Sequence, residues 1–136
     1  LAQACRQEQL SLIPYSPLAG GVLSGKYNDG ALPEGARFTK YMNVGARQAA
    51  MARRFVNDAS LASTERFMTI AEQAGIAPVT LATAWSKQHD FVASTIVGAT
   101  HPDQLADIFA AADLVLDDDV MNAIDVVSRD IRYPMG

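Results

Sequence analysis

The chain has 136 residues, enough for one ordinary domain and too few for two. Eleven basic and fifteen acidic residues give a net charge of −4 without a basic stripe, so neither nucleic acid nor a membrane surface is expected as a partner. Hydrophobic residues make up 49% of the chain and charged residues 19%, which is typical of a folded globular protein. No apolar run approaches the roughly 20 residues that a membrane span needs.

The cysteine content and the first residues indicate a cellular compartment. The single cysteine, Cys5, cannot form an internal disulfide, and no leader with a cleavage site precedes it. We therefore expect a cytoplasmic protein in which Cys5 is a small helix-core residue rather than a nucleophile. Leu1, Ala4 and Cys5 share one helical face, so the sequence is expected to begin inside a helix.

A short apolar segment comes first, followed by a long glycine-rich one. Residues 11–15 (SLIPY) suit a buried strand, because Pro14 would break a helix. Residues 18–27 are rich in glycine, and residues 28–46 contain glycines and a proline without a clear helical period. We predict a long loop over residues 18–46, and long ordered loops usually bind a ligand.

Two helices are predicted in the middle of the chain, after a helix-permissive stretch over residues 47–59. The first covers residues 61–74 and ends at Gly75. Its apolar positions recur at helical spacing: Phe67, Ile70, Ala71 and Ala74. The second covers residues 78–88, begins with a proline and carries Trp85 as a core anchor.

A second strand and two further helices are predicted toward the C-terminus. Residues 92–97 (VASTIV) are β-branched and short, and a helix opens after residue 102. The expected inner face of that helix consists of Leu105, Ile108, Phe109 and Ala112. Residues 117–119 supply a cap for a last helix whose apolar positions are Val120, Ile124 and Val127. Because helices separate the two strands, the strands should lie parallel in one sheet, whose other strands must come from elsewhere.

The glycine-rich segment contains a candidate phosphate site. Residues 20–26 (GGVLSGK) have the spacing of a P-loop directly after a predicted strand. Tyr27, however, stands where a P-loop needs a small hydroxyl for magnesium, which argues against nucleotide hydrolysis. Backbone amides of the turn, together with Lys26, can still hold an anionic group. The alternative is a flexible surface turn.

A second candidate anion site follows the second predicted strand at Gly98, Ala99 and Thr100. Taken alone, this segment is explained more simply by Thr100 capping the next helix. Two such sites at the carboxyl ends of consecutive parallel strands indicate a nucleotide, because the loops after strands seven and eight often build the phosphate site of eight-stranded barrels.

Two motifs resemble the aldo-keto reductases. Residues 15–21 (YSPLAGG), continuing into residues 23–27 (LSGKY), resemble the strand-seven segment of the branch that includes potassium-channel β-subunits and related bacterial oxidoreductases. Residues 97–105 (VGATHPDQL) resemble the strand-eight signature. The resemblance covers nearly the whole chain. It implies an α/β fold in which residues 1–136 form the C-terminal part, strands seven and eight with flanking helices, of a single (β/α)₈ TIM barrel.

The first motif implies binding of NADPH. By this resemblance Tyr15 stacks on the nicotinamide ring, with a core tyrosine as the alternative. Further positions line the pyrophosphate and its ribose: Ser16, Pro17, Leu18 and Gly20. Lys26 matches a phosphate-contacting lysine and Arg37 an arginine that reaches the adenosine end, with solvated surface charge as the alternative for both.

The second motif implies contacts with the far end of the cofactor. Positions matching the site of the adenosine 2′-phosphate are Gly98, Thr100 and Gln104, while Asp107 matches an acidic residue beside the adenine. The chain departs from the family at Ile108, where an asparagine is usual. An isoleucine can pack on the base but cannot pair with its edge, so adenine affinity is expected to fall by about 0.5–1.5 kcal/mol. Protonated His101 can touch the 2′-phosphate, or is simply exposed.

The resemblance places the catalytic residues outside this chain. The proton donor of the family is a tyrosine assisted by a lysine, an aspartate and a histidine on earlier strands. We therefore expect no catalytic residue and no metal site here, and no activity without the remainder of the barrel. The complete protein is expected to reduce a small aldehyde or ketone by hydride transfer from NADPH, with residues 41–45 and 133–134 as candidates for substrate recognition. The alternatives are a non-catalytic NADPH-sensing subunit and an inactive truncated fragment.

Overall fold

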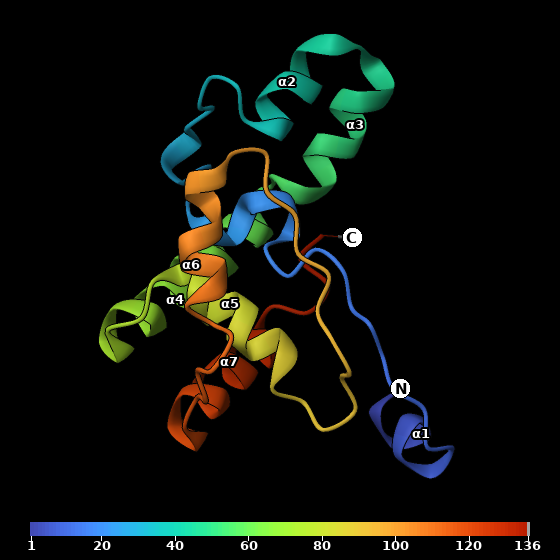
Figure 1. Ribbon diagram of the computed structural model, residues 1–136. Helices are drawn as coiled ribbons and strands as arrows, with labels where there is room; N and C mark the ends of the chain where they lie inside the picture. Colours follow the sequence, from blue (N-terminus) through green and yellow to red (C-terminus); the bar gives the residue numbers. More distant parts are fainter. Residues whose placement is uncertain (136) are drawn as a thin grey trace.

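The computed structural model describes residues 1–135, and its helices make up most of the ordered structure (Figure 1). The α-helices are α1 (Ala2–Gln7), α2 (Arg37–Val44), α3 (Ala46–Phe55), α4 (Asp58–Ala74), α5 (Pro78–Lys87), α6 (Leu105–Phe109) and α7 (Asp118–Asp130). Three short 3₁₀ helices are η1 (Ala19–Ser24), η2 (Asn28–Gly30) and η3 (Pro102–Gln104). The α2–α3 hairpin stands at one end of the body and α1 lies apart at the other (Figure 1).

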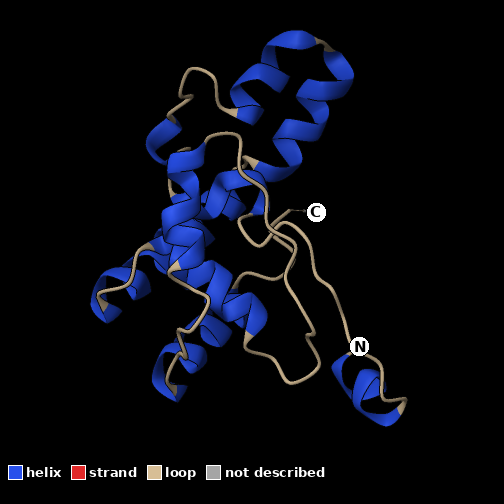
Figure 2. Ribbon diagram, in the orientation of Figure 1, coloured by secondary structure: helices blue, strands red, loops and turns tan. Residues whose placement is uncertain are grey.

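The two predicted strands are not formed as continuous elements within residues 1–135 (Figure 2). Two isolated parallel bridges take their place, between Leu12 and Val92 and between Tyr15 and Ile96. The parallel direction agrees with the prediction. Continuous strands are missing because Pro14 has no N–H to donate and because no further strand among the described residues pairs with either segment.

The prediction of a long loop over residues 18–46 is wrong, because η1, η2 and α2 form within it. Phe38, on α2, is 2% exposed, and its ring stacks on Phe55 of α3 with ring centroids 4.9 Å apart. Tyr41 and Met42 pack against the same cluster. The spacing of Phe38, Tyr41 and Met42 at i, i+3 and i+4 was the signal of this helix, obscured by the glycines and proline around it.

Helix ends follow local side-chain chemistry. α4 begins earlier than predicted because Asn57 and Ser60 form a reciprocal capping box, in which Ser60 N donates to Asn57 Oδ1 at 3.0 Å and Asn57 N donates to Ser60 Oγ at 3.2 Å. Gly75 ends α4 in the left-handed conformation, as predicted. Asp117 caps α7 by accepting from Val120 N at 2.9 Å, which confirms the predicted cap.

Two apolar clusters hold the helices together. The larger joins α4, α5 and α7 through Phe67, Ala71, Leu81, Ala82, Ala84, Ala111, Leu116 and Ile124. Trp85 is partly buried against this cluster, which confirms its predicted core position. The smaller joins η1 to the α2–α3 hairpin through Val22, Tyr27, Phe38 and Ala52. Burial of these side chains is the main source of the stability of this part of the molecule.

The inner face predicted for residues 105–112 is partly wrong. Ile108 is buried, but Phe109 is 64% exposed and Ala112 also faces solvent. α6 ends at Phe109, and the turn after it rotates Ala111 rather than Ala112 into the core. Cys5 is buried within α1, as predicted. No helix formed by residues 1–135 is long and apolar enough to cross a membrane.

Candidate functional site

The structure brings the two predicted binding segments side by side. Tyr15 is bridged to Ile96, and Ile96 N donates to the carbonyl oxygen of Pro14 at 2.8 Å. Because the two segments run parallel, they leave this bridge in the same direction. The residues that follow Tyr15 and Ile96 therefore start from a common edge, and Figure 2 shows the long tan loops that contain this bridge running beside each other.

The first segment is a tightly wound turn. Ser16 and Ala19 adopt positive φ angles of 61° and 49°, and Gly20 and Gly21 adopt 68° and 98°. Gly20 N donates to Ser16 Oγ at 3.1 Å, so these two predicted site residues hold each other in place. A Cβ atom on Gly20 would come within 2.6 Å of the Phe38 ring, so the turn has no room for a side chain there.

Lys26 lies across this turn. A Cβ atom on Gly21 would come within 2.7 Å of Lys26 Nζ, and the ammonium group stands 5.4 Å from the centroid of the Tyr27 ring. Burial, and then the positive charge of Arg37, lower the pKa of Lys26. The positive charges of Lys26 and Arg37 repel each other beside the glycine-rich turn. An anion bound there would therefore be stabilised by both charges.

Gly21 lies within both predicted motifs, but its own contribution was not singled out from the sequence. Its missing side chain is what allows Lys26 to lie over the turn, and its carbonyl oxygen accepts from Ser24 Oγ at 2.7 Å. The paired glycines of the sequence were the available signal. Tyr27 is fully buried and its hydroxyl accepts from Phe38 N at 3.1 Å, so it belongs to the core.

The second segment is organised by Gln104. Thr100 N and Thr100 Oγ1 both donate to Gln104 Oε1, at 2.8 and 3.3 Å. The simpler interpretation of Thr100 as a helix cap is wrong, because His101 occupies that position and its Nδ1 accepts from Asp103 N at 3.4 Å. His101 Nδ1 also lies 3.1 Å from the Asp103 carboxylate. Gly98, Thr100 and Gln104 are all exposed.

The positions expected beside an adenine ring differ in accessibility. Asp107 is exposed, and its backbone carbonyl accepts from Thr80 Oγ1 at 2.7 Å, which ties α6 to α5. Ile108 is only 6% exposed. The expectation that Ile108 packs on the base is therefore wrong, because its side chain is used in the core.

The remaining predicted positions fall into two groups. Tyr15 is 81% exposed, so its ring is free to stack and is not a core tyrosine. Arg37, at the start of α2, is also exposed. Leu18 packs against the larger core cluster, and Pro17 lines an apolar pocket between η1 and the helices. These two positions therefore support the turn.

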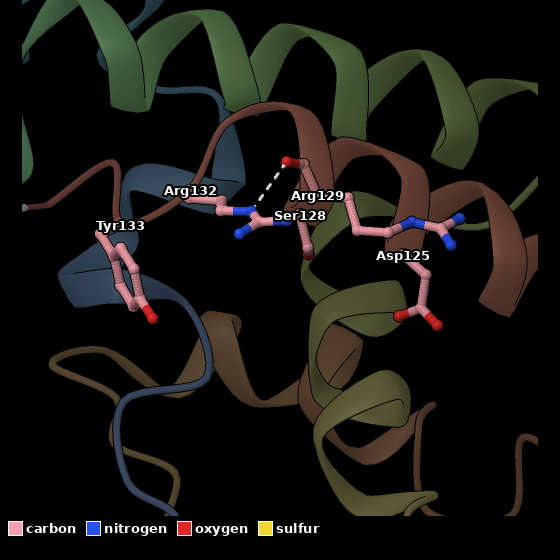
Figure 3. Close-up of a pocket in the computed structure, with 5 residues that line it drawn as sticks. All are labelled: Asp125, Ser128, Arg129, Arg132 and Tyr133. Carbon is pink, nitrogen blue, oxygen red and sulfur yellow. Dashed lines mark hydrogen bonds between the residues drawn. The ribbon is translucent and has the colours of Figure 1, made fainter.

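A separate hollow lies at the C-terminal end of α7 (Figure 3). Asp125, Ser128, Arg129, Arg132 and Tyr133 line it, and Arg132 Nε donates to the backbone oxygen of Arg129 at 3.3 Å. None of the predicted cofactor positions lines this hollow. Among residues 1–135, no group of three or more histidine, cysteine or carboxylate side chains is placed to hold a metal ion.

Comparison with known proteins relates the chain to one family. The model of the Aldo/keto reductase family matches residues 1–129. Protein tas of Escherichia coli (strain K12) is 34% identical over 134 residues, which are 98% of this chain and 36% of that protein.

Two further relatives match a smaller share of this chain. A probable voltage-gated potassium channel subunit beta of Arabidopsis thaliana is 36% identical over 108 residues, 78% of this chain and 31% of that protein. L-glyceraldehyde 3-phosphate reductase of E. coli (strain K12) is 28% identical over 105 residues, 77% of this chain and 29% of that protein. The chain thus spans about a third of the length of the curated relatives it matches.

Proposed function

Because the chain belongs to the aldo/keto reductase family, we propose that it supplies the cofactor-binding part of an NADPH-dependent oxidoreductase that reduces aldehydes or ketones to alcohols. In this proposal residues 11–15 and 92–97 correspond to strands seven and eight of a (β/α)₈ barrel, which the remainder of the barrel completes. The observation that supports it is the parallel Tyr15–Ile96 bridge, which pairs the first residue of one family motif with the residue just before the other. Ligands of α/β barrels bind at the carboxyl ends of the strands.

The residues present fit an extended anionic cofactor. The exposed ring of Tyr15 offers a face for stacking, and the Lys26 ammonium beside the Arg37 charge favours a pyrophosphate. Gln104 holds Thr100 in place at the end proposed for the adenosine. When bound, NADPH would supply the hydride. The chain's own part is to orient the cofactor, because we assign the proton donor to earlier strands.

Exposed apolar side chains support the need for further chain. Ile13 is 60% and Ile96 54% exposed on the two segments that pair in parallel, and Leu10, just before the first segment, is also 60% exposed. Strands of parallel sheets are normally covered on both faces, so we propose that the remainder of the barrel covers these side chains. We also propose a cytoplasmic location, on the ground that the one cysteine is buried and unpaired.

Calorimetric titration with NADPH and with NADH, with the intact mass measured on the same sample, tests this function. We expect at least tenfold tighter binding of NADPH, about 1.4 kcal/mol. Lys26→Met should weaken binding of both cofactors about tenfold, since it removes a charge-assisted contact. Lys40→Met, on the exposed side of α2, is the matched control and should change nothing.

Two other results would replace the proposal. No binding at the mass of this chain would identify an inactive fragment. Binding of NADPH by the complete protein without turnover of any carbonyl compound would favour a non-catalytic sensing subunit. The similarity to channel subunits beta is the observation that keeps this second function in consideration.

A further inference from the structure

The tail after α7, residues 131–135, folds back onto the helical body. Tyr133 adopts a positive φ of 52°, and its side chain is 87% exposed. The next two residues, Pro134 and Met135, instead line a pocket of about 180 Å³ to which η1, α4, α5 and α7 also contribute (Figure 1). The tail thus forms part of the wall of this pocket.

The glycine-rich turn borders the same pocket. Pro17 and Ala19 belong to its lining. Ser16 and Ala19 have φ angles of 61° and 49°, in the left-handed region that residues with a side chain rarely adopt. Residues in such conformations keep them only where the surrounding structure holds them. The conformation of the turn therefore depends on the packing behind Pro17 and Ala19.

Asn57 joins the tail to the helical body. Its Nδ2 donates to the backbone oxygen of Pro134 at 3.0 Å, across 77 residues of sequence, and to the backbone oxygen of Arg54 at 2.9 Å. Its Oδ1 accepts from Ser60 N at 3.0 Å, which caps α4. One side chain thus has two separate tasks, and the amide nitrogen alone holds the tail.

We propose that the tail is a strap that closes the pocket behind the glycine-rich turn, with Asn57 as the positioning residue that fastens it. Release of the strap would let water into the pocket and weaken the packing that supports Pro17 and Ala19. The coupling between tail and turn is reciprocal, so a ligand that orders the turn should also order the tail. Only this last step rests on the proposed function, because it takes NADPH as the ligand.

Asn57→Asp separates the two tasks of this side chain. Aspartate is as good a helix cap as asparagine, so the carboxylate still accepts from Ser60 N, but it has no N–H to donate to Pro134. In the complete protein, amide hydrogen exchange of residues 16–24 should become about tenfold faster, the equivalent of one lost hydrogen bond. Asp117→Asn is the matched control. It makes the opposite exchange of groups at the cap of α7 and should leave residues 16–24 unchanged.

Deletion of residues 134–136 tests whether Asn57 acts through the tail. The deletion should speed exchange of residues 16–24 by the same factor, and Asn57→Asp should then add less than about twofold. If Asn57 acted only by capping α4, the two effects would multiply. Multiplied effects would overturn the proposal. Unchanged exchange at residues 16–24 after the deletion would also overturn it, even if Asn57→Asp fails to fold.

NADPH provides the last comparison. Saturating NADPH should slow amide exchange at residues 131–135 as well as at residues 16–24 of the unaltered protein. Binding of NADPH that slows exchange at the turn but not at the tail would overturn the coupling. Failure of the unaltered protein to bind NADPH would instead contradict the proposed function, and the variants would still decide whether the tail holds the turn.

Discussion

The helical body and the paired segments at residues 11–15 and 92–97 differ sharply in how well their apolar side chains are buried. In the body, Ala71, Leu81 and Ala84 have no exposed surface. On the paired segments, Tyr15 is 81% and Ile96 54% exposed. The difference follows from backbone chemistry. A helix satisfies its hydrogen bonds within itself, whereas a strand depends on neighbours that residues 1–135 do not supply.

The comparison also separates two kinds of residue in the candidate site. Ser16, Gly20 and Lys26 are held by the helical side of the molecule, through contacts with one another, with Phe38 and with Gly21. Tyr15 and Thr100 lie on the open side, where Tyr15 is bridged to Ile96 and Thr100 donates to Gln104. Contacts with the helices therefore fix the conformation of the turn. The positions of Tyr15 and Thr100 depend instead on the strands that would pair with their segments.

The largest expected effect is in the helical body. Leu81 has no exposed surface and belongs to the larger apolar cluster, so Leu81→Ala leaves a cavity there. We expect it to lower the free energy of unfolding by about 2–5 kcal/mol. Ile13→Ala, on the open side, should change it by less than about 0.5 kcal/mol. Urea unfolding of both variants measures the difference. Equal effects would mean that the paired segments are as well packed as the body.

A smaller effect is expected where the turn meets the hairpin. Gly20→Ala places a Cβ atom at a residue whose φ is 68° and only 2.6 Å from the Phe38 ring. We therefore expect the free energy of unfolding to fall by about 2–4 kcal/mol. Gly30→Ala has a similar φ of 73° but open space around it, and should cost only about 1–2 kcal/mol. Thermal unfolding compares them. If the two variants lose the same stability, Phe38 does not constrain the turn.

Loss of one buried hydrogen bond should have an effect below that of Gly20→Ala. Tyr27→Phe removes the hydroxyl that accepts from Phe38 N and leaves this N–H without its partner, at a cost of about 1–3 kcal/mol. Faster hydrogen exchange of the Phe38 amide would accompany the loss. Tyr133→Phe, at a side chain that is 87% exposed, is the control and should be neutral. An unchanged exchange rate at Phe38 would contradict the assignment of this bond.

The smallest effect is expected at the ion pair that ties α1 to the open side. Arg6 donates to Asp90 through Nε at 2.7 Å and through Nη2 at 2.8 Å, and this contact lowers the pKa of Asp90. The folded state therefore gains stability at neutral pH that is lost as the pH falls through the lowered pKa. Asp90→Asn should slightly flatten the fall in melting temperature between about pH 5 and pH 2. A steeper fall in the melting temperature of Asp90→Asn would contradict this prediction.

Local patterns in the sequence predicted much of the helical body. The periodicity of residues 61–74, Gly75 as a stop, the proline at the start of α5 and the Asp117 cap were all confirmed, because each depends on neighbours within one or two turns. α2 was missed because glycines and a proline flank a short helix whose apolar side chains contact η1, and such long-range contacts leave little trace in a local pattern.

By itself the sequence determined the family and the order of its binding motifs, since both consist of residue types at fixed spacing. Only the tertiary structure decided that Ile108 is a core residue and that the ring of Phe38 closes over Gly20. The physical reason is that burial and close contact depend on which elements meet in space. That meeting is set by packing across the whole chain, and a local pattern does not encode it.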